Sequence, residues 1–181
     1  EFDLSKKDVN ALKNNIFYFS SAKSYTQLLE INNLLTDEDG NKRTFEEFKR
    51  EVENLNVKFN KTWLQTEYEY AIATTQVITR WKELTADDPD VLLTYDAVGD
   101  GNTTPLCNGL NGTTLPASDN FWLLNTPPNH FKCRSTIARG QEIKQPPKNI
   151  PEVSEEFAFN PAIEMKIFHE KLSYFKNYND D

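Results

Sequence analysis

The sequence has few cysteines, histidines and glycines, and it contains no long apolar stretch. Two cysteines among 181 residues cannot form the dense disulfide framework of small secreted domains. No run of about 18 apolar residues is present, which argues against a membrane-spanning helix, so we expect no membrane partner. Residues 1–7 lack the apolar core of a signal peptide, and we therefore expect that no signal peptide directs secretion.

Basic residues are outnumbered by acidic ones. The chain has 20 Lys and Arg against 28 Asp and Glu, which gives a formal net charge of −8. A surface that binds a nucleic-acid backbone normally has the opposite balance, so we expect any contact with DNA to be indirect. Aromatic residues are plentiful instead, with 12 Phe, 7 Tyr and 3 Trp to fill the core of one domain, with or without a small lobe.

The first half of the chain has helical periodicity. Apolar side chains recur every three to five residues over 4–35, the spacing of one face of a helix. Within this stretch, Ser24 followed by Gln27 resembles a capping box, so we expect a helix to begin at that point.

The longest periodic segment covers 44–84. It opens with a second capping box, Thr44 with Glu47, and its apolar positions then step mainly by three and four. We expect one long helix, or two helices joined near Asn60. The segment should end before Pro89, because proline disfavours helical geometry in the residue before it.

After Pro89, short β-branched and aromatic runs replace the helical spacing. Three of them, 91–95, 112–116 and 135–139, predict short strands. The proline-rich stretch 145–151 predicts a stiff linker.

The last regular element is predicted to be a short closing helix. Asn160 is suited to cap it, and Pro161 is suited to its first position. His169 would lie on its polar side, at the surface. Its apolar stripe would comprise Met165, Phe168, Leu172 and Phe175.

These segments predict an α+β protein, in which long N-terminal helices pack with a small, loop-rich antiparallel β unit and a short C-terminal helix. We divide the chain into a helical region, 1–86, and a β unit, 87–145. A linker and the closing helix, 146–181, complete it.

Residues whose side chains could bind a metal or take part in catalysis are concentrated between positions 95 and 139. His130 and Cys133 are three residues apart on one predicted loop, and Cys107 and Asp100 could reach them from an earlier loop. Thiolate, imidazole and carboxylate groups are zinc ligands, so these four residues form a candidate zinc site. The pattern is incomplete, because a structural zinc site normally shows paired ligands on both sides.

Two other interpretations stay open. His130 could activate Cys107 or Cys133 as the nucleophile of a cysteine hydrolase, although neither cysteine follows a strand-to-helix elbow. The simplest interpretation needs neither a metal nor an enzyme. In it, the cysteines are buried apolar residues or a single bridge, and His130 is a hydrogen-bonded loop residue. We favour this interpretation and expect no cofactor.

Other catalytic signatures are missing from the sequence. It has no phosphate-binding loop, dinucleotide fingerprint, paired-histidine helix or nucleophile elbow. We therefore expect a non-enzymatic protein without a small-molecule substrate. An aromatic-rich helical arm beside a small β unit suits an assembly protein, because aromatic side chains are favoured at interfaces.

An ordered set of residues runs from the first predicted strand to the last. It comprises Tyr95, Asp100, Cys107, Leu110-Asn111-Gly112, Leu115-Pro116, Trp122, Pro127-Pro128-Asn129 and Cys133-Arg134. This set resembles the phage head-morphogenesis proteins, also described as Mu F-like minor head proteins. Many members of that family end the motif with Cys-Arg-Cys, whereas this chain has Ser135 at the last position, which removes one thiolate.

The resemblance implies a minor capsid protein of a phage or prophage. Such a protein acts with the portal and other head proteins during capsid assembly and DNA packaging. It would be located in the bacterial cytoplasm during assembly and in the virion afterwards. The same domain precedes larger polymorphic toxin chains, so a toxin delivery domain is the alternative that the resemblance carries.

The motif loops are too short to form a core of their own. We therefore expect them to fold back on one another and bring Cys107 close to His130 and Cys133. Arg134 should be largely buried and bonded to Asp100 or to backbone carbonyls of residues 96–112, because a guanidinium can bond a carboxylate and carbonyl groups at once.

Overall fold

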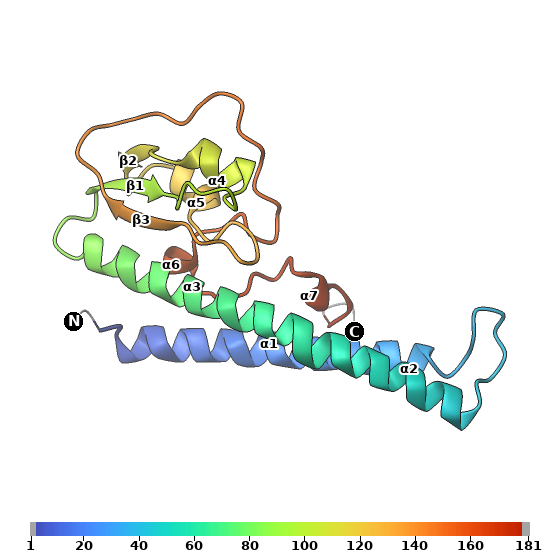
Figure 1. Ribbon diagram of the computed structural model, residues 1–181. Coiled ribbons are helices and arrows are strands. Elements are labelled where there is room, and N and C mark those ends of the chain that lie inside the picture. Colours follow the sequence, from blue (N-terminus) through green and yellow to red (C-terminus); the bar gives the residue numbers. More distant parts are fainter. Residues whose placement is uncertain (1–2, 179–181) are drawn as a thin grey trace.

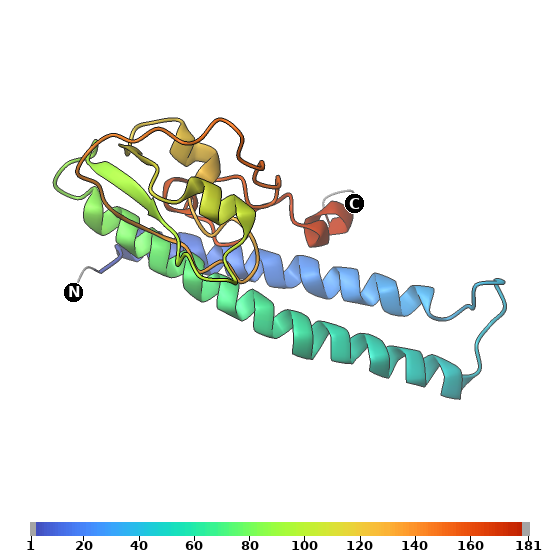
Figure 2. The same ribbon diagram turned by 45° about the horizontal axis from the view of Figure 1, so that its top comes forward.

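The computed structural model describes residues 3–178 as a mixture of helices and sheet. Two long antiparallel helical arms form a hairpin, and the β unit lies against one of them (Figure 1, Figure 2). The arrangement confirms the predicted α+β class, with long N-terminal helices, a small antiparallel sheet and a short C-terminal helix. The division at residues 86 and 145 stays a prediction.

The helical arms are α1 (Lys6–Asn33) and a continuous segment made of α2 (Phe45–Val57), the π-helical η1 (Lys58–Trp63) and α3 (Leu64–Leu84). The remaining elements are β1 (Leu92–Asp96), α4 (Pro105–Leu110), β2 (Thr114–Pro116), α5 (Phe121–Asn125), β3 (Thr136–Arg139), α6 (Pro161–Glu164) and α7 (Ser173–Tyr178). Within residues 3–178, none of the helices has the length and apolar character needed to cross a membrane.

The first arm, α1, is one uninterrupted helix, so the predicted helix start at Ser24 is wrong. The helix begins after Ser5, whose hydroxyl accepts a hydrogen bond from the Asp8 N–H at 3.1 Å. Ser24 lies inside the helix and donates its hydroxyl to the Ser20 carbonyl at 2.9 Å. This bond gives the hydroxyl a partner in the preceding turn, so the side chain does not act as a cap.

The predicted capping box at the start of α2 is confirmed. The Glu47 N–H donates to Thr44 Oγ1 at 3.3 Å, and the Thr44 N–H donates to Glu47 Oε2 at 2.9 Å. The predicted joint near Asn60 coincides with η1, which widens the backbone without ending the helix. Phe59 is fully buried in this turn, whereas Lys58 and Asn60 on either side are exposed.

The three strands form one antiparallel sheet in the order β2-β1-β3. They confirm the predicted strands to within two residues at each end. In the central strand, Leu93 lies opposite Leu115 of β2, and Tyr95 lies opposite Ile137 of β3. All four side chains are buried, so one face of the sheet belongs to the core.

Aromatic rings join the β unit to α3. Trp122 of α5 is fully buried and meets Trp81 of α3 edge to face, with ring centroids 5.9 Å apart. Tyr70 of α3 meets Phe131 in the same way at 5.3 Å. The loop that carries the candidate site residues therefore rests directly on the long helix.

The predicted closing helix is wrong as a single element. Asn160 caps α6 as expected, because its Oδ1 accepts from the N–H groups of Ala162 and Ile163, but α6 has only four residues. It ends at Met165, which has a left-handed φ of 52°. His169 is half-buried rather than on an exposed helix face. The predicted stripe still contributes three buried side chains, Phe168, Leu172 and Phe175.

A side chain of α1 explains why the helix does not continue. Asn15 Oδ1 accepts hydrogen bonds from the N–H groups of Ile167 and Phe168, both at 2.8 Å, and Asn15 Nδ2 donates to the Phe168 carbonyl at 2.9 Å. These bonds satisfy backbone groups that a longer helix would have paired internally. Phe168 is thereby held against Phe19 of α1, with ring centroids 3.7 Å apart.

Replacing Asn15 with alanine should destabilise the protein, because the backbone groups at Ile167 and Phe168 lose their partners. We expect the free energy of unfolding, measured by chemical denaturation, to fall by about 1–3 kcal/mol. Asn14→Ala, at an exposed neighbouring position of α1, is the matched control and should change stability by less than about 0.5 kcal/mol. Equal stabilities of the two variants would contradict this role of Asn15.

Candidate functional site

The loop after α5 brings His130 and Cys133 to one place. The Cys133 N–H donates to the His130 carbonyl at 3.2 Å and closes a four-residue turn. Within this turn, Lys132 has a left-handed φ of 61°, which is uncommon for a residue other than glycine. The imidazole nitrogen of His130 and the sulfur of Cys133 lie within 4.8 Å of each other as a result.

Cys107 reaches the same place from α4. Thr104 caps this helix, because its hydroxyl accepts the Cys107 N–H at 3.3 Å. Cys107 Sγ lies 3.3 Å from His130 Nε2 and 3.8 Å from Cys133 Sγ. The expected proximity of the three side chains, here called the Cys-His cluster, is confirmed. Both cysteines are buried free thiols, and a role as metal ligands or as a disulfide stays a prediction.

The hydrogen bonds of His130 indicate which ring nitrogen carries the proton. His130 Nδ1 lies 2.8 Å from the carbonyl oxygen of Phe131, which can only accept. Nδ1 therefore carries the hydrogen, and Nε2 presents its lone pair toward Cys107 Sγ and, at 3.2 Å, Thr104 Oγ1. A neutral imidazole in this state can accept a thiol proton or bind a metal ion.

The two thiols titrate as a pair. The hydrogen bond from Cys133 lowers the pKa of Cys107, and the same contact raises the pKa of Cys133. Burial raises the pKa of Tyr95, whose hydroxyl lies 3.3 Å from Cys107 Sγ and 2.8 Å from Asn129 Oδ1. The first proton of the pair therefore leaves Cys107, while Tyr95 stays neutral.

Asp100 does not join the cluster as a fourth ligand. Arg134 Nη1 and Nη2 donate to Asp100 Oδ2 and Oδ1 at 2.8 and 2.6 Å, and this bidentate pair engages both carboxylate oxygens. The expected bond is confirmed, and it holds the pKa of Asp100 well below its usual range. The expected burial of Arg134 is wrong, because its side chain is 47% exposed. The pair links two loops at the surface, where the guanidinium keeps part of its hydration.

The other residues of the sequence motif contribute to the folding of the β unit: they are buried side chains or adopt a particular backbone conformation. Tyr95 and Trp122 are fully buried, and Pro127 and Pro128 are buried in the loop before His130. Gly112 has a φ of 77° between α4 and β2, a conformation that side-chain-bearing residues rarely adopt.

A small cavity borders the Cys-His cluster. Its volume is about 20 Å³, and Thr104, Cys107, His130 and Ser135 are among the residues that line it. A cavity of this size has room for about one water molecule. It has no room for a peptide or a sugar.

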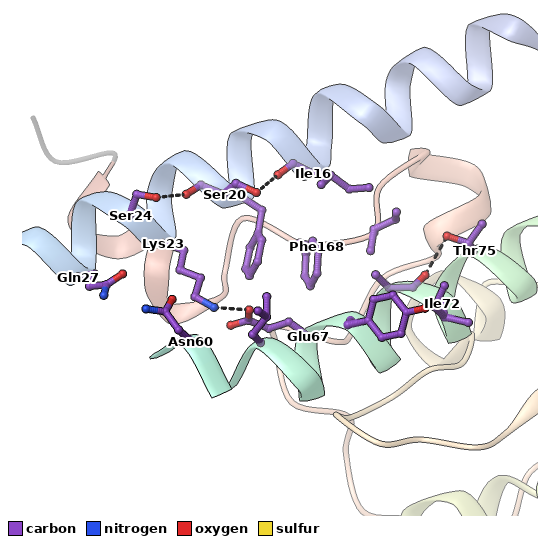
Figure 3. Close-up of a pocket in the computed structure, with 15 residues that line it drawn as sticks. Ile16, Ser20, Lys23, Ser24, Gln27, Asn60, Glu67, Ile72, Thr75 and Phe168 are labelled. Carbon is purple, nitrogen blue, oxygen red and sulfur yellow. Dashed lines mark hydrogen bonds and ion pairs between the residues drawn. The ribbon is translucent and has the colours of Figure 1, made fainter. Parts of the chain in front are cut away.

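A second candidate is an apolar groove between α1 and α3, here called the hairpin groove (Figure 3). Its volume is about 510 Å³. Phe19 of α1 and Phe168 of the C-terminal segment line its interior, as the close-up shows for Phe168. The lining side chains that remain 41–62% exposed are Ile16, Leu64, Tyr68 and Ile72.

A buried ion pair lies in the hairpin groove. Lys23 Nζ is 2.5 Å from Glu67 Oε2 and also donates to the Phe59 carbonyl at 3.1 Å. The Tyr174 hydroxyl donates to Glu67 Oε1 at 3.0 Å, and burial raises the pKa of Tyr174. Each charged group of the pair has partners within the protein, so the pair requires no charge from a ligand.

Sequence reasoning did not identify the hairpin groove or its ion pair. Lys23 and Glu67 are 44 positions apart, and no local pattern marks two charged residues as partners over that distance. One signal was available in α1, where apolar residues occupy more than one face. Leu12 and Phe19 are buried, whereas Phe17 is 77% exposed.

Comparison with protein families gives a match over the middle of the chain. A family model described as Phage Mu protein F like protein matches residues 30–138, which is more than half of the chain. The matched region contains the whole motif from Tyr95 to Arg134 and therefore all of the Cys-His cluster. No curated protein and no solved structure matches the chain.

Arg134→Ala should lower the melting temperature, because it removes the bidentate pair that joins two loops. Arg134→Lys should restore only part of the loss, since an ammonium group cannot reproduce the planar fork. The folded-state pKa of Asp100 is lowered, so the pair stabilises above the ordinary aspartate pKa of about 3.9 and is lost as the pH falls below it. The difference between Arg134→Ala and the wild type, measured by thermal unfolding, should therefore shrink in acid.

Arg50→Ala is the matched control, because the Arg50 side chain is 69% exposed and its ion pair within residues 3–178 is with the adjacent residue, Glu51. It should leave the melting temperature unchanged at every pH. If Arg134→Ala lowered the melting temperature no more than Arg50→Ala, the Arg134–Asp100 pair would not contribute to stability.

Proposed function

The chain belongs to the Phage Mu protein F like family of head-morphogenesis proteins, and from this membership we propose that it is a minor head protein that acts with the portal in capsid assembly and DNA packaging. Membership makes it a structural phage protein that associates with other head proteins and has its place in the virion. Among the head proteins, we propose the portal as the partner that this chain binds. The net charge of −8 repels the DNA backbone, which supports a role in packaging without direct binding of DNA by this chain.

The hairpin groove is the observation that carries the proposed contact with the portal. Large exposed apolar surfaces on soluble proteins mark interaction sites. The groove lies along two antiparallel helices, and a third helix laid into such a trough completes a bundle. Because Lys23 and Glu67 are already paired, the third helix needs apolar side chains and no matching charge. We therefore assign the groove to an amphipathic helix of the portal.

The surroundings of the Cys-His cluster favour a non-enzymatic role. A cysteine hydrolase needs a nucleophile that substrate can reach, whereas Cys107 is only 2% exposed. The cavity of about 20 Å³ beside Cys107 leaves no room for a scissile bond, and Cys133, which borders a wider surface hollow, is itself only 5% exposed. His130 Nδ1 faces the backbone carbonyl of Phe131, not a carboxylate that would stabilise an imidazolium.

Binding of the purified chain to the portal ring of the same phage tests the proposal directly, for example by biolayer interferometry. Leu64→Glu and Ile72→Glu place a charge in the groove at exposed positions, so both variants should fold. Each should weaken portal binding by more than about tenfold, as expected for an apolar anchor of an interface.

Leu124→Glu is the matched control, because Leu124 is an apolar residue of α5 that is 57% exposed outside the groove. It should bind the portal ring as the wild type does, and thermal unfolding should show that all three variants are folded. A wild-type chain that does not bind the ring would refute the portal assignment. Groove variants that bind as tightly as Leu124→Glu would refute the groove as the contact.

A further inference from the structure

The Cys-His cluster has the composition and the spacing of a metal site. We propose that Cys107, His130 and Cys133 bind one zinc ion, and that a water molecule supplies the fourth ligand. The three donor atoms come from α4 and from the turn after α5, and they lie within 4.8 Å of one another. Thiolate sulfur and imidazole nitrogen are the ligands that zinc takes most often in tetrahedral protein sites.

The distances between the donor atoms match those of zinc coordination. Two thiolates at about 2.3 Å from a tetrahedral zinc ion are separated by about 3.8 Å, and a thiolate and an imidazole nitrogen by about 3.6 Å. Cys107 Sγ lies 3.8 Å from Cys133 Sγ and 3.3 Å from His130 Nε2. These two separations are close to the ones that zinc requires, and the third pair of donor atoms, in His130 and Cys133, lies within 4.8 Å.

The surroundings of His130 are those of a metal ligand. Its Nδ1–H is directed at the Phe131 carbonyl at 2.8 Å, which leaves the lone pair of Nε2 on the side of Cys107. A second hydrogen bond of this kind orients most metal-binding histidines and fixes their tautomer. Nε2 lies 3.3 Å from the Cys107 sulfur and 3.2 Å from Thr104 Oγ1, so its lone pair is directed into the cluster.

The small cavity would hold the fourth ligand, because Cys107 and His130 both line it and its lining contains Lys132 and Arg134 but no carboxylate. Asp100 is engaged by Arg134 through both oxygens, so it is not available. The cavity borders Cys107 and His130 and has room for about one water molecule. Ser135 is buried at the same cavity and interacts with the Cys107 thiol, so a cysteine at position 135 would supply a further thiolate.

A zinc ion bound by Cys107 of α4 and by His130 and Cys133 would link α4 to the loop before β3. Neither segment is long, and a bound metal stabilises the folded state in proportion to its affinity. The bound zinc ion would therefore stabilise the folded β unit. This proposal is independent of the assignment of the portal as the partner. Failure of portal binding would leave the zinc site unaffected.

Metal content tests the proposal. The full chain, produced with added zinc and purified under reducing conditions, should contain one zinc ion per molecule by mass spectrometry of the metal. After exchange with cobalt, it should show the thiolate-to-cobalt charge-transfer band and the intense visible bands of a tetrahedral site. Cys133→Ser and His130→Ala should each weaken zinc binding by about tenfold or more, judged by competition with a chelating dye.

Two further variants keep the test decisive if a ligand variant fails to fold. His169→Ala removes the other histidine, which belongs to a partly exposed group with Glu164 and Glu170, and it should leave zinc content unchanged. Ser135→Cys should hold zinc about tenfold more tightly than the wild type, because it replaces water with a thiolate. A reduced wild-type chain that binds neither zinc nor cobalt would overturn the proposal. So would a Cys107–Cys133 disulfide in that preparation, or a Ser135→Cys variant with no gain in affinity.

Discussion

The ion pair between Lys23 and Glu67 connects the two long helical arms. The side chains of the pair are 12% and 7% exposed, so each charge depends on the other to offset its loss of hydration. Lys23 also bonds to the backbone of η1 at Phe59, and Tyr174 adds a hydroxyl from the C-terminal segment. One network therefore joins α1, the π turn and the end of the chain. The pair lines the hairpin groove together with Phe168, whose ring contacts Phe19 of α1 and Tyr70 of α3.

The long helix α3 connects the two candidate sites. Tyr68 and Ile72 line the hairpin groove, whereas Tyr70, between them in the helix, packs on Phe131 in the turn that carries His130 and Cys133. A metal at the Cys-His cluster would make that turn more rigid and fix the β unit on the helix that forms the groove. The proposed division, with the groove for contact and the cluster for stability, fits a protein that is built into a larger assembly.

Local signals in the sequence predicted two of the three proposed helix starts, failed at Ser24, and could not reveal the distant contacts that interrupt the closing helix. The capping residue of α2, Thr44, and that of α6, Asn160, were both identified, because a cap depends on residues within one turn. The closing helix was not predicted correctly, since Asn15, far away in α1, takes over the backbone hydrogen bonds at Phe168. The proximity of Cys107 to His130 was predicted because the loops that carry them are too short to form a core of their own, whereas the Lys23–Glu67 pair had no local signal.

A double-mutant cycle on Lys23 and Glu67 tests most directly whether this pair stabilises the connection between the two long helical arms. The free energies of unfolding of Lys23→Met, Glu67→Leu and the double variant would be measured by chemical denaturation. Each single variant should lose about 3–5 kcal/mol, because it leaves one buried charge without its partner. The double variant should lose much less than the sum of the two. Additive losses, or single variants as stable as the wild type, would contradict the central place of this ion pair.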